Sequence, residues 1–445
     1  MKQELYKNYF QINGKGKKVT VMGLGLLGRG IGDTAFLASL CDEVLVTDKK
    51  SVEELETSIE TLKNFSNIKY FLGNHRLEDF KDRDFVLKSA GVPIESEFIK
   101  HARDNNVPVY MSAVLITKII KEQLKNVKII GITGTRGKST TTHIIEHILT
   151  NTGHKVHLGG NVRGVANLPL LEEIEDGDFL VLELDSWQLQ GFGDLKISPD
   201  VAVFTSFMDD HLNYYKGDRD LYFKDKANIF LNQKEGDVCI VSAQTKEIFD
   251  KQKINKKIIV PEIRNIKSHL IGEHNQTAIT LAIEVAKHCG VSEVEAVKAV
   301  ENVKSVEGRL EYMGDFNDVK IFNDNNATTP DATIVAIKSI NETFNKKPIL
   351  IIGGTDKNLD LTALEKVLEN DVKEIIYLSG TGTDKISLPK KYEFEKLEDC
   401  VTKAFDVAND GDIILYSPAF ASFSKYFRNE YEKNDAFVSF VMKYQ

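Results

Sequence analysis

Residues 131–142 read GITGTRGKSTTT, and the chain on either side of them predicts how they fold. The preceding residues 127–130 are apolar except for one lysine and predict a buried strand, whereas THIIEHIL at residues 142–149 predicts a helix. The glycines therefore lie at a strand-to-helix turn, where backbone N–H groups and the helix dipole attract anions and glycine lets a phosphate come close. This stretch predicts a phosphate-binding loop.

The predicted loop supplies two kinds of ligand for a nucleotide. Lys138 would reach the terminal phosphates, and the hydroxyl of Ser139 or Thr140 would bind Mg²⁺. The strict pattern G-x-x-x-x-G-K-[ST] is not met, because its first glycine would fall at Ile132 and the earlier glycine is Gly134. Strand, glycines and helix are nevertheless in register, so we favour a phosphate loop over an ordinary tight turn.

The length and composition predict a multidomain protein. With 445 residues, 42% of them hydrophobic, the chain can bury several cores, and roughly 150 residues per domain gives about three domains. The formal net charge of −9 argues against general binding to nucleic acids or anionic membranes, which requires a clustered basic surface. Anionic ligands would be bound by local lysine and arginine side chains.

Signals for export and for membrane insertion are missing from the sequence. The stretch MKQELYKNYFQINGKGKK lacks an apolar core, and no window is apolar over the length that a membrane helix requires. The four cysteines are far apart and form no C-x-x-C pair, which favours reduced thiols over a zinc site or disulfides. We expect a cytoplasmic protein.

Strand-like and helix-like segments alternate in three blocks, which predicts α/β domains built on parallel sheets. Strands of the first block are expected in KKVTVM (17–22), EVLVTD (43–48), DFVLK (84–88) and VPVYM (107–111). The second block begins at the strand before the phosphate loop, and the third contains KPILIIGG (347–354) and GDIILYSP (411–418). We place the three domains at residues 1–113, 114–304 and 305–445.

A second glycine motif follows the first strand. The glycines of VMGLGLLG (21–28) form G-x-G-x-x-G, and Asp48 ends the next strand twenty residues after the last of them. By spacing, this is a nucleotide fingerprint, with glycines that let the backbone approach a diphosphate and a carboxylate on a ribose hydroxyl. The motif does not say which nucleotide. A second glycine-ended strand, with Ser89 and Gly91, would close over the same ligand.

Acidic and imidazole side chains follow two strands of the second block. Glu183 ends the apolar strand in VLELDSWQL (181–189), where a carboxylate would bind Mg²⁺ directly or through water, and Asp185 is two residues on. FTSFMDDHLNYY (204–215) places two aspartates and His211 after another strand. Parallel sheets bind ligands at the carboxyl ends of their strands, so these groups are expected to face the phosphate site.

The chain resembles the Mur ligases over nearly all of its length. The matching stretches occur in the family's order and near its spacing, and they are TGTRGKSTTT, GGNVRG, VLELDSWQL, DDHLNYY with KDKANIF, GEHNQTA, GRLE, FNDNNATTPDAT, GGTDK and SPAFASF. The resemblance implies an N-terminal Rossmann-like domain for the UDP of the substrate and a central P-loop ATPase domain. It also implies a C-terminal Rossmann-like domain that brings the amino acid. The glycine motif then requires no NAD.

The resemblance assigns catalytic roles to individual residues. Lys138 becomes the phosphate-loop lysine, and Ser139 with Glu183 would bind one Mg²⁺. His211 would bind a second Mg²⁺. Lys226, fifteen residues beyond His211, matches the family lysine that reacts with CO₂. The resulting carbamate turns an ammonium into an oxygen ligand suited to a hard cation.

The resemblance also implies three sets of ligand contacts. The expected ATP contacts are Gly134, Thr135, Arg136, Gly137, Lys138, Ser139, Thr140, Asn275, Arg309 and Asp324. The expected contacts with the uridylated substrate are Gly25, Leu26, Leu27, Asp48, Ser89, Gly91, Asn161, Asp185 and Gln188. The expected contacts with the carboxylates of the amino acid are Thr328, Lys357 and Ser422.

Several positions depart from the family pattern. They are Arg136 for Asn, Asp185 for Ser, Ala278 for Asn, Gly308 for His, Asn326 for Lys, and the stretch SFSKYFRNEYEKND (422–435), which lacks the usual Asp and Arg-Gly. The sequence therefore supports ligase chemistry more strongly than the identity of either substrate.

The leading hypothesis is an ATP-dependent amide ligase that adds glutamate to UDP-N-acetylmuramoyl-L-alanine through an acyl phosphate, in the synthesis of the peptidoglycan precursor. One alternative keeps this chemistry with another amino acid or acceptor. Another is an NAD-dependent oxidoreductase, which leaves the phosphate loop unexplained. The last is an inactive ligase-like binding subunit, and Lys138, Glu183, His211 and Lys226 count against it. We expect a monomer that uses ATP and two Mg²⁺ ions.

Overall fold

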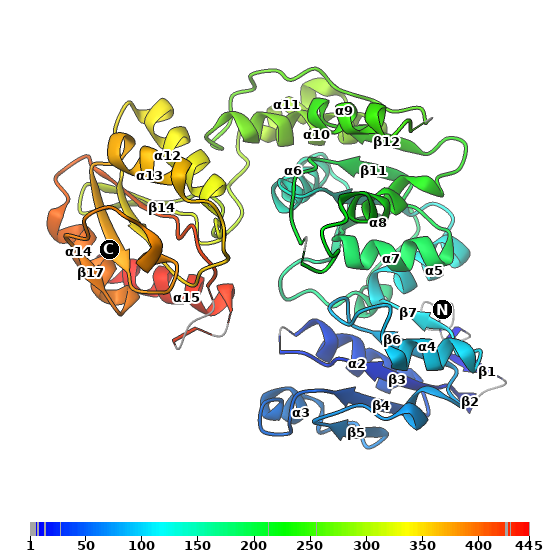
Figure 1. The fold of residues 1–445 in the computed structure, drawn as a ribbon. Coiled ribbons are helices and arrows are strands. Elements are labelled where there is room, and N and C mark those ends of the chain that lie inside the picture. The colour runs from blue at the N-terminus through cyan, green and yellow to red at the C-terminus, as the bar shows by residue number, and fades with distance from the viewer. Residues whose placement is uncertain are drawn as a thin grey trace. The chain divides into compact units, whose positions relative to one another are not determined.

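The chain is mixed α/β, as predicted. Figure 1 shows a computed structural model that describes residues 6, 9–12, 15–26, 28–211, 213–254, 256–422, 426–427 and 429–444. The Cα positions separate two compact units, Met1–Ile263 with Thr277–Ala299, and Arg264–Gln276 with Val300–Gln445. The first unit contains two five-stranded parallel sheets and a small pair of strands, β1 (Gln11–Ile12) and β2 (Lys15–Gly16). The second unit contains a six-stranded mixed sheet.

The first parallel sheet has the strand order β5-β4-β3-β6-β7. Its elements are β3 (Lys18–Met22), α2 (Arg29–Leu40), β4 (Glu43–Asp48), α3 (Glu56–Leu62), β5 (Ile68–Leu72), β6 (Phe85–Lys88), α4 (Glu97–Asp104) and β7 (Val109–Tyr110). The chain changes direction across the sheet between β3 and β6, and such sheets bind ligands in the crevice at the strand ends beside this point. The loops after β3 and β6 therefore flank the predicted nucleotide diphosphate site.

The second parallel sheet has the order β12-β11-β8-β10-β9, which places the strand before the phosphate loop at its centre. Its strands are β8 (Lys128–Thr133), β9 (Val156–Gly160), β10 (Phe179–Glu183), β11 (Val201–Phe204) and β12 (Val238–Val241). The helices around it are α5 (Ser112–Gln123), α6 (Lys138–Asn151), α7 (Ser186–Leu195), α8 (Arg219–Leu231), α9 (Ala243–Lys251), α10 (Glu273–His288) and α11 (Glu293–Val300). The strands are apolar and buried, as expected for a parallel sheet covered on both faces.

The two parallel sheets share one continuous apolar core. Phe36 of α2, Ile116 of α5 and Leu180 of β10 belong to the same buried cluster. A buried carboxylate spans the junction, because Asp33 of α2 accepts a hydrogen bond from the Leu168 backbone N–H at 2.8 Å. Burial raises the pKa of Asp33 to about 6, although its hydrogen bonds act in the opposite direction. The first two sheets therefore pack as one body.

The sheet of the second unit has the order β13-β14-β18-β15-β16-β17, with β13 antiparallel and the others parallel. Its strands are β13 (Glu311–Phe316), β14 (Val319–Asn323), β15 (Ile349–Ile352), β16 (Glu374–Leu378), β17 (Glu393–Phe394) and β18 (Ile413–Tyr416). Helices α12 (Pro330–Phe344) and α13 (Thr362–Asp371) pack on one face, and α14 (Leu397–Val407) and α15 (Glu430–Val441) on the other (Figure 1). This arrangement is the expected Rossmann-like architecture.

Two sequence expectations about the whole chain can be compared with the structure. No described helix has the length and apolar character required to cross a membrane. All four cysteines are free and buried, as expected.

The predicted domain boundary after residue 113 falls inside α5, and the predicted boundary after residue 304 follows the end of α11. The domain boundaries stay predictions.

Candidate active site

The phosphate loop has a backbone that requires glycine. Gly134 has φ +150°, and a Cβ built on it would lie 2.0 Å from Thr205 Oγ1, so any side chain would collide with the end of the neighbouring strand. Gly137 has φ +84° and immediately precedes α6, whose first residue is Lys138. The loop therefore opens α6 with its backbone close to β11, and this is the strand-to-helix turn that the sequence predicts.

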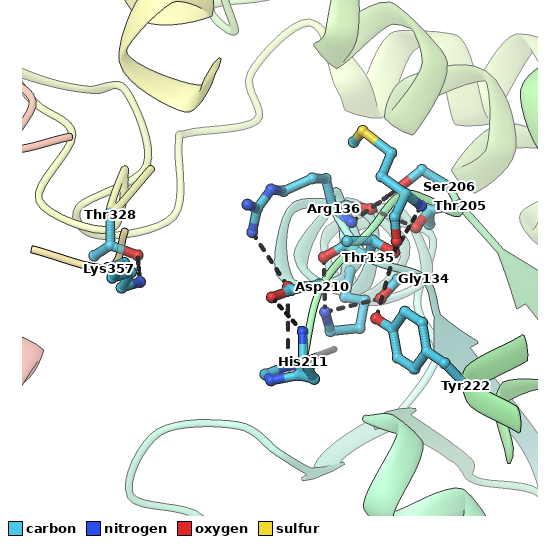
Figure 2. Close-up of polar contacts among 12 residues, drawn as sticks. Gly134, Thr135, Arg136, Thr205, Ser206, Asp210, His211, Tyr222, Thr328 and Lys357 are labelled. Carbon is cyan, nitrogen blue, oxygen red and sulfur yellow. Dashed lines mark hydrogen bonds and ion pairs between the residues drawn. The ribbon is translucent and has the colours of Figure 1, made fainter. Parts of the chain in front are cut away.

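The chain after β11 holds the loop from one side (Figure 2). Thr205 Oγ1 donates to Arg136 O at 2.5 Å, and Ser206 Oγ accepts from Arg136 N at 2.8 Å. The Thr135 backbone N–H donates to Ser206 O at 2.8 Å. The loop lacks the first glycine of the strict phosphate-loop pattern. The hydroxyls after β11 nevertheless fix its backbone, because they form hydrogen bonds with the N–H and C=O groups of Arg136.

Two lysines converge on one carbonyl of this loop. Lys138 Nζ donates to Gly134 O at 3.0 Å and to Thr135 O at 3.3 Å, and Lys226 Nζ donates to the same Gly134 O at 2.9 Å. Lys226 is only 2% exposed. Burial lowers the pKa of Lys226 well below its usual value, and the Lys138 ammonium lowers it further. The predicted catalytic lysines are therefore brought together.

His211 lies beside the loop with aromatic neighbours. Its ring centroid is 4.9 Å from that of Trp187, and its Nε2 is 3.8 Å from Asp210 Oδ2. The same Asp210 oxygen is 3.8 Å from Arg136 Nη1, so Asp210 lies between the loop and His211 (Figure 2). Burial lowers the pKa of His211, although Asp210 opposes the shift. The neutral imidazole, which is the form that binds metals, is therefore favoured.

The remaining predicted Mg²⁺ ligands, Ser139 and Glu183, come from elements that adjoin the loop. Glu183 is the last residue of β10, is 5% exposed, and pairs with Ile132 of β8. Ser139 is the second residue of α6. Among the described residues, no group of three or more His, Cys, Asp or Glu side chains is placed to hold a metal ion. The Ser139 hydroxyl and the Glu183 carboxylate are nevertheless oxygen donors that fit a hard cation completed by nucleotide phosphates, whereas the imidazole of His211 is a softer ligand than Mg²⁺ prefers.

The N-terminal glycine loop is organised by Asp48. Asp48 is 8% exposed, and its Oδ2 accepts from the backbone N–H groups of Leu24 at 2.8 Å and Gly25 at 3.3 Å. Its Oδ1 accepts from Lys50 N at 2.9 Å. The carboxylate therefore shapes the loop, and its predicted contact with a ribose stays a prediction. Leu26 is 40% exposed, and Leu27 lies outside the described residues.

Two predicted substrate contacts, Asp185 and Gln188, form a capping box at the start of α7. The Asp185 carboxylate accepts from Gln188 N at 2.7 Å, and Gln188 Oε1 accepts from Asp185 N at 3.2 Å. β10 ends before them, so Asp185 does not continue the strand of Glu183. The D-x-x-Q spacing is the sequence signal for this cap.

A further contact in the first unit was not predicted. Arg29, the first residue of α2, donates through Nη1 to Asn161 Oδ1, which joins the N-terminal glycine loop to the second sheet. Asn161 also donates its backbone N–H to Glu183 O at 2.7 Å. An arginine directly after G-x-G-x-x-G is the only sequence signal for this link, because the partner is 132 residues away.

The second unit brings the predicted amino-acid contacts onto adjoining loops. Lys357 Nζ donates to Thr328 Oγ1 at 3.0 Å (Figure 2). Ser422 follows Ala421, which pairs with Thr355 in an antiparallel bridge. Ser422 is 4% exposed, and its Oγ is buried without a hydrogen-bond partner among the described residues. An unpaired buried hydroxyl is costly, so this atom is suited to bind a ligand.

Two predicted ATP contacts of the second unit, Asn275 and Asp324, are buried, whereas Arg309 is exposed. Asp324 accepts from Leu310 N and Ser417 Oγ, both at 2.9 Å, and burial raises its pKa to about 7 while Arg309 opposes the shift. Asn275 Nδ2 donates to Ile271 O at 2.7 Å. Each of these residues has a structural role in the absence of ligand, and their contacts with ATP stay predictions.

Gly308 and Asn326, two departures from the family pattern, lie beside Asn434, which belongs to the divergent stretch 422–435. A Cβ built on Gly308 would lie 2.9 Å from Asn434 Oδ1 and 3.1 Å from Asn326 Nδ2. Gly308 also has φ +68°, which disfavours other residues. The glycine at position 308 therefore leaves space that the side chains of the two asparagines approach.

Comparisons with known proteins match nearly the whole chain. Residues 132–317 match the Mur ligase middle domain, and residues 308–420 match the glutamate ligase domain of Mur ligases. The UDP-N-acetylmuramoylalanine–D-glutamate ligase of Borreliella afzelii is 34% identical, and the match covers 95% of this chain and 96% of that protein. The ligase of the same name from Ligilactobacillus salivarius is 31% identical, with 96% and 97% covered.

Solved structures share the fold at lower sequence identity. UDP-N-acetylmuramate-alanine ligase MurC from Thermotoga maritima has a TM-score of 0.62 and 18% identity, and the match covers 96% of this chain and 100% of that one. MurF ligase from Thermotoga maritima, solved in complex with ADP, has a TM-score of 0.60 and 16% identity, with 90% and 95% covered.

Proposed function

Because this chain belongs to the Mur ligase family, we propose that it joins D-glutamate to UDP-N-acetylmuramoyl-alanine in an ATP-dependent step of peptidoglycan synthesis. The observation that carries the chemistry is the convergence of Lys138 and Lys226 on Gly134 O, at the mouth of a glycine loop that opens α6. The choice of substrates is supported by relatives of that name at 30–34% identity over nearly the full chain.

The proposed reaction has two steps. A carboxylate oxygen of the acceptor attacks the γ-phosphorus of ATP, the bond from that phosphorus to ADP breaks, and an acyl phosphate forms. The amine of glutamate then attacks the acyl carbon, phosphate leaves with its oxygen, and one proton is lost from nitrogen. Phosphoryl transfer of this kind is catalysed by positioning and by stabilising charge on the phosphoryl oxygens.

The phosphate loop supplies this stabilisation. The backbone N–H groups at the start of α6 point toward anions bound there, and Lys138 adds a mobile positive charge. Without nucleotide, Lys138 donates to two loop carbonyls, and we expect it to exchange these bonds for phosphate oxygens. The buried Lys226 is anchored to the same loop, so its position is fixed relative to the transferred group.

Ser139, Glu183, His211 and a carbamate on Lys226 would hold the two Mg²⁺ ions. Bound Mg²⁺ would neutralise negative charge on the phosphates. A carbamate forms when the neutral amine attacks CO₂ and loses a proton, and the near-complete burial of Lys226 favours the neutral amine. His211 and Asp210 lie beside the loop, as a site for the second ion requires.

The second unit would bind the glutamate. Lys357 and Thr328 already form a pair, and the Ser422 hydroxyl, which has no hydrogen-bond partner in the part of the chain that the structure describes, lies on the adjoining loop. One ammonium and two hydroxyls suit an amino acid with two carboxylates, because hydrogen bonds to an ionised carboxylate are stronger than those to a neutral side chain.

A phosphate-release assay tests the proposal. ATP hydrolysis should depend on both a UDP-muramoyl-alanine acceptor and D-glutamate, and L-glutamate, D-aspartate, alanine and lysine should support less. Release with a different acceptor or a neutral amino acid would favour a Mur-type ligase of another specificity.

Separate titrations with UDP and NADH distinguish a ligase from an oxidoreductase. A ligase of this kind should bind UDP and should not bind NADH. Monomeric state and cytoplasmic location stay predictions, and light scattering would measure the first.

A further inference from the structure

Lys88 is a buried charge at the carboxyl end of β6. It is the last residue of β6, the strand at which the order of strand addition across the sheet reverses, and only 2% of it is exposed. Lysine is almost never fully buried unless its ammonium is paired. None of the ligand contacts implied by the sequence includes Lys88, so its burial needs a separate explanation.

The ammonium of Lys88 holds the turn that follows it. Lys88 Nζ donates to Val92 O at 2.9 Å and to Ser89 O at 3.3 Å. The turn is also closed by its own backbone, because Val92 N donates to Ser89 O at 3.2 Å. One positive charge therefore binds both ends of the turn Ser89 to Val92, which contains the predicted contacts Ser89 and Gly91.

This turn packs directly against the glycine loop. A Cβ built on Gly23 would lie 2.5 Å from Ser89 Oγ and 3.6 Å from Val92 Cγ2. Ser89 N donates to Met22 O at 2.9 Å, which ties the turn to the end of β3. A shift of the turn would therefore change the shape of the crevice between the two loops.

The charge on Lys88 is balanced from the second sheet. Burial lowers the pKa of Lys88 to about 8, while the carboxylates of Asp185 and Asp194 favour the ammonium and Arg103 disfavours it. Asp185 caps α7, and Asp194 near the end of α7 pairs with Arg103 of α4 at 2.6 Å. The charged groups that act on Lys88 thus come from α4 and α7.

We propose that Lys88 is a positioning residue for the nucleoside diphosphate, because its ammonium fixes the Ser89 to Val92 turn against the glycine loop in the shape that receives the ligand. The proposal rests on the proposed function for the identity of that ligand as UDP. Lys88 would act through this turn, because its Nζ donates to the carbonyls of Ser89 and Val92.

Titration calorimetry with UDP and, separately, with ATP tests this role in the full chain. Lys88→Met keeps the length of the side chain and removes its charge, and it should weaken UDP binding by about tenfold, a typical effect for a hydrogen bond to a charged group, while leaving ATP binding unchanged. Lys88→Arg keeps the charge and should restore part of the loss. Lys100→Met, at an exposed position of α4, is the matched control and should bind both nucleotides as wild type does.

The pH dependence of UDP affinity is a second test. A side chain with a purely structural role would not alter this dependence. Wild-type affinity for UDP should fall as pH rises from 7 to 9, because Lys88 loses its proton near pH 8, and the affinity of Lys88→Arg should stay level. This comparison remains available if Lys88→Met does not fold. Equal UDP affinity of wild type and Lys88→Met, or equal loss of UDP and ATP binding, would overturn the role of Lys88. Failure of the wild type to bind UDP would instead overturn the proposed function.

Discussion

Lys138 and Lys226 donate hydrogen bonds to the same backbone oxygen, that of Gly134, at 3.0 and 2.9 Å. Two ammonium groups at one carbonyl repel each other. The two lysines differ in burial, and therefore in how strongly each is driven to lose its proton. Lys226 is almost inaccessible to water, whereas Lys138 is partly exposed at the start of α6. We therefore expect Lys138 to follow bound phosphates, and we expect Lys226, whose pKa burial lowers, to stay in place as a neutral amine.

Lys138→Ala should lower the ATP-dependent rate by about 10²- to 10³-fold, the effect of removing one group that stabilises charge in a transition state. UDP binding should stay near the wild-type value, because the glycine loop after β3 belongs to a different sheet from the phosphate loop. Phosphate release and UDP calorimetry on the same preparation measure both effects. An equal loss of UDP affinity in a folded variant would contradict the separation of the two sites.

Lys226→Ala should be nearly inactive and should regain part of its rate with a short carboxylic acid such as acetate. The added carboxylate would supply the oxygen ligands that a carbamate provides. The wild-type rate should also fall when CO₂ is depleted and recover when bicarbonate is added. Full activity without CO₂, or a normal rate in Lys226→Ala, would argue that the lysine is not carbamylated.

Asn326→Lys should lower the KM for D-glutamate. Asn326 lies two residues before Thr328, whose backbone N–H donates to Asn326 O at 3.0 Å, so a longer cationic side chain would add positive charge near the predicted carboxylate contacts. The wild type should accordingly show a higher KM than family members with lysine here. Steady-state kinetics with D-glutamate, L-glutamate, D-aspartate and a neutral amino acid provide the comparison, and a preference for the neutral one would refute an acidic substrate.

Gly308→Ala should destabilise the second unit by about 1–3 kcal/mol, because the positive φ and the close asparagines both oppose a Cβ. The loss should be smaller in an Asn434→Gly background, since Asn434 Oδ1 is the nearest atom at 2.9 Å. Urea unfolding of the four variants gives the coupling free energy. Strictly additive losses would show that the two positions do not interact.

Asp33→Asn should raise thermal stability at neutral pH. The pKa of Asp33 is raised from 3.8 to about 6, so the folded state binds more protons than the unfolded state between these values and stability falls as pH rises through them. Above pH 6 the cost is constant and corresponds to about 3 kcal/mol. Calorimetric melting temperatures of wild type and variant between pH 5 and 8 should converge toward the acidic end. Parallel curves would mean that Asp33 titrates normally.

The phosphate loop could be predicted because its signal is local. Strand, glycines, lysine and helix lie within a short stretch, and the structure gives Gly134 and Gly137 the positive φ values that only glycine adopts readily. Glu183 at the end of β10 was predictable for the same reason. The burial of Lys226 was not, because the sequence of α8 distributes polar and apolar residues around the helix, and only the family resemblance singled out this lysine.

Other features depend on residues that are distant in sequence. The link between Arg29 and Asn161, and the hydrogen bonds that Asp48 accepts from the glycine loop, are made only when the strands are assembled. The capping box of Asp185 and Gln188 is local and was open to prediction from its spacing. The resemblance instead directed attention to substrate contacts at these two positions.

The shared apolar core of the first two sheets links their ligands thermodynamically. Because Phe36, Ile116 and Leu180 belong to one buried cluster, neither sheet can unfold without exposing part of the other. A nucleotide bound at the end of β3 therefore protects the phosphate loop from global unfolding as well, and one present at a hundred times its Kd adds about 2.7 kcal/mol to the stability of both sheets. Amide hydrogen exchange in α6 would thus slow when UDP binds elsewhere in the same unit.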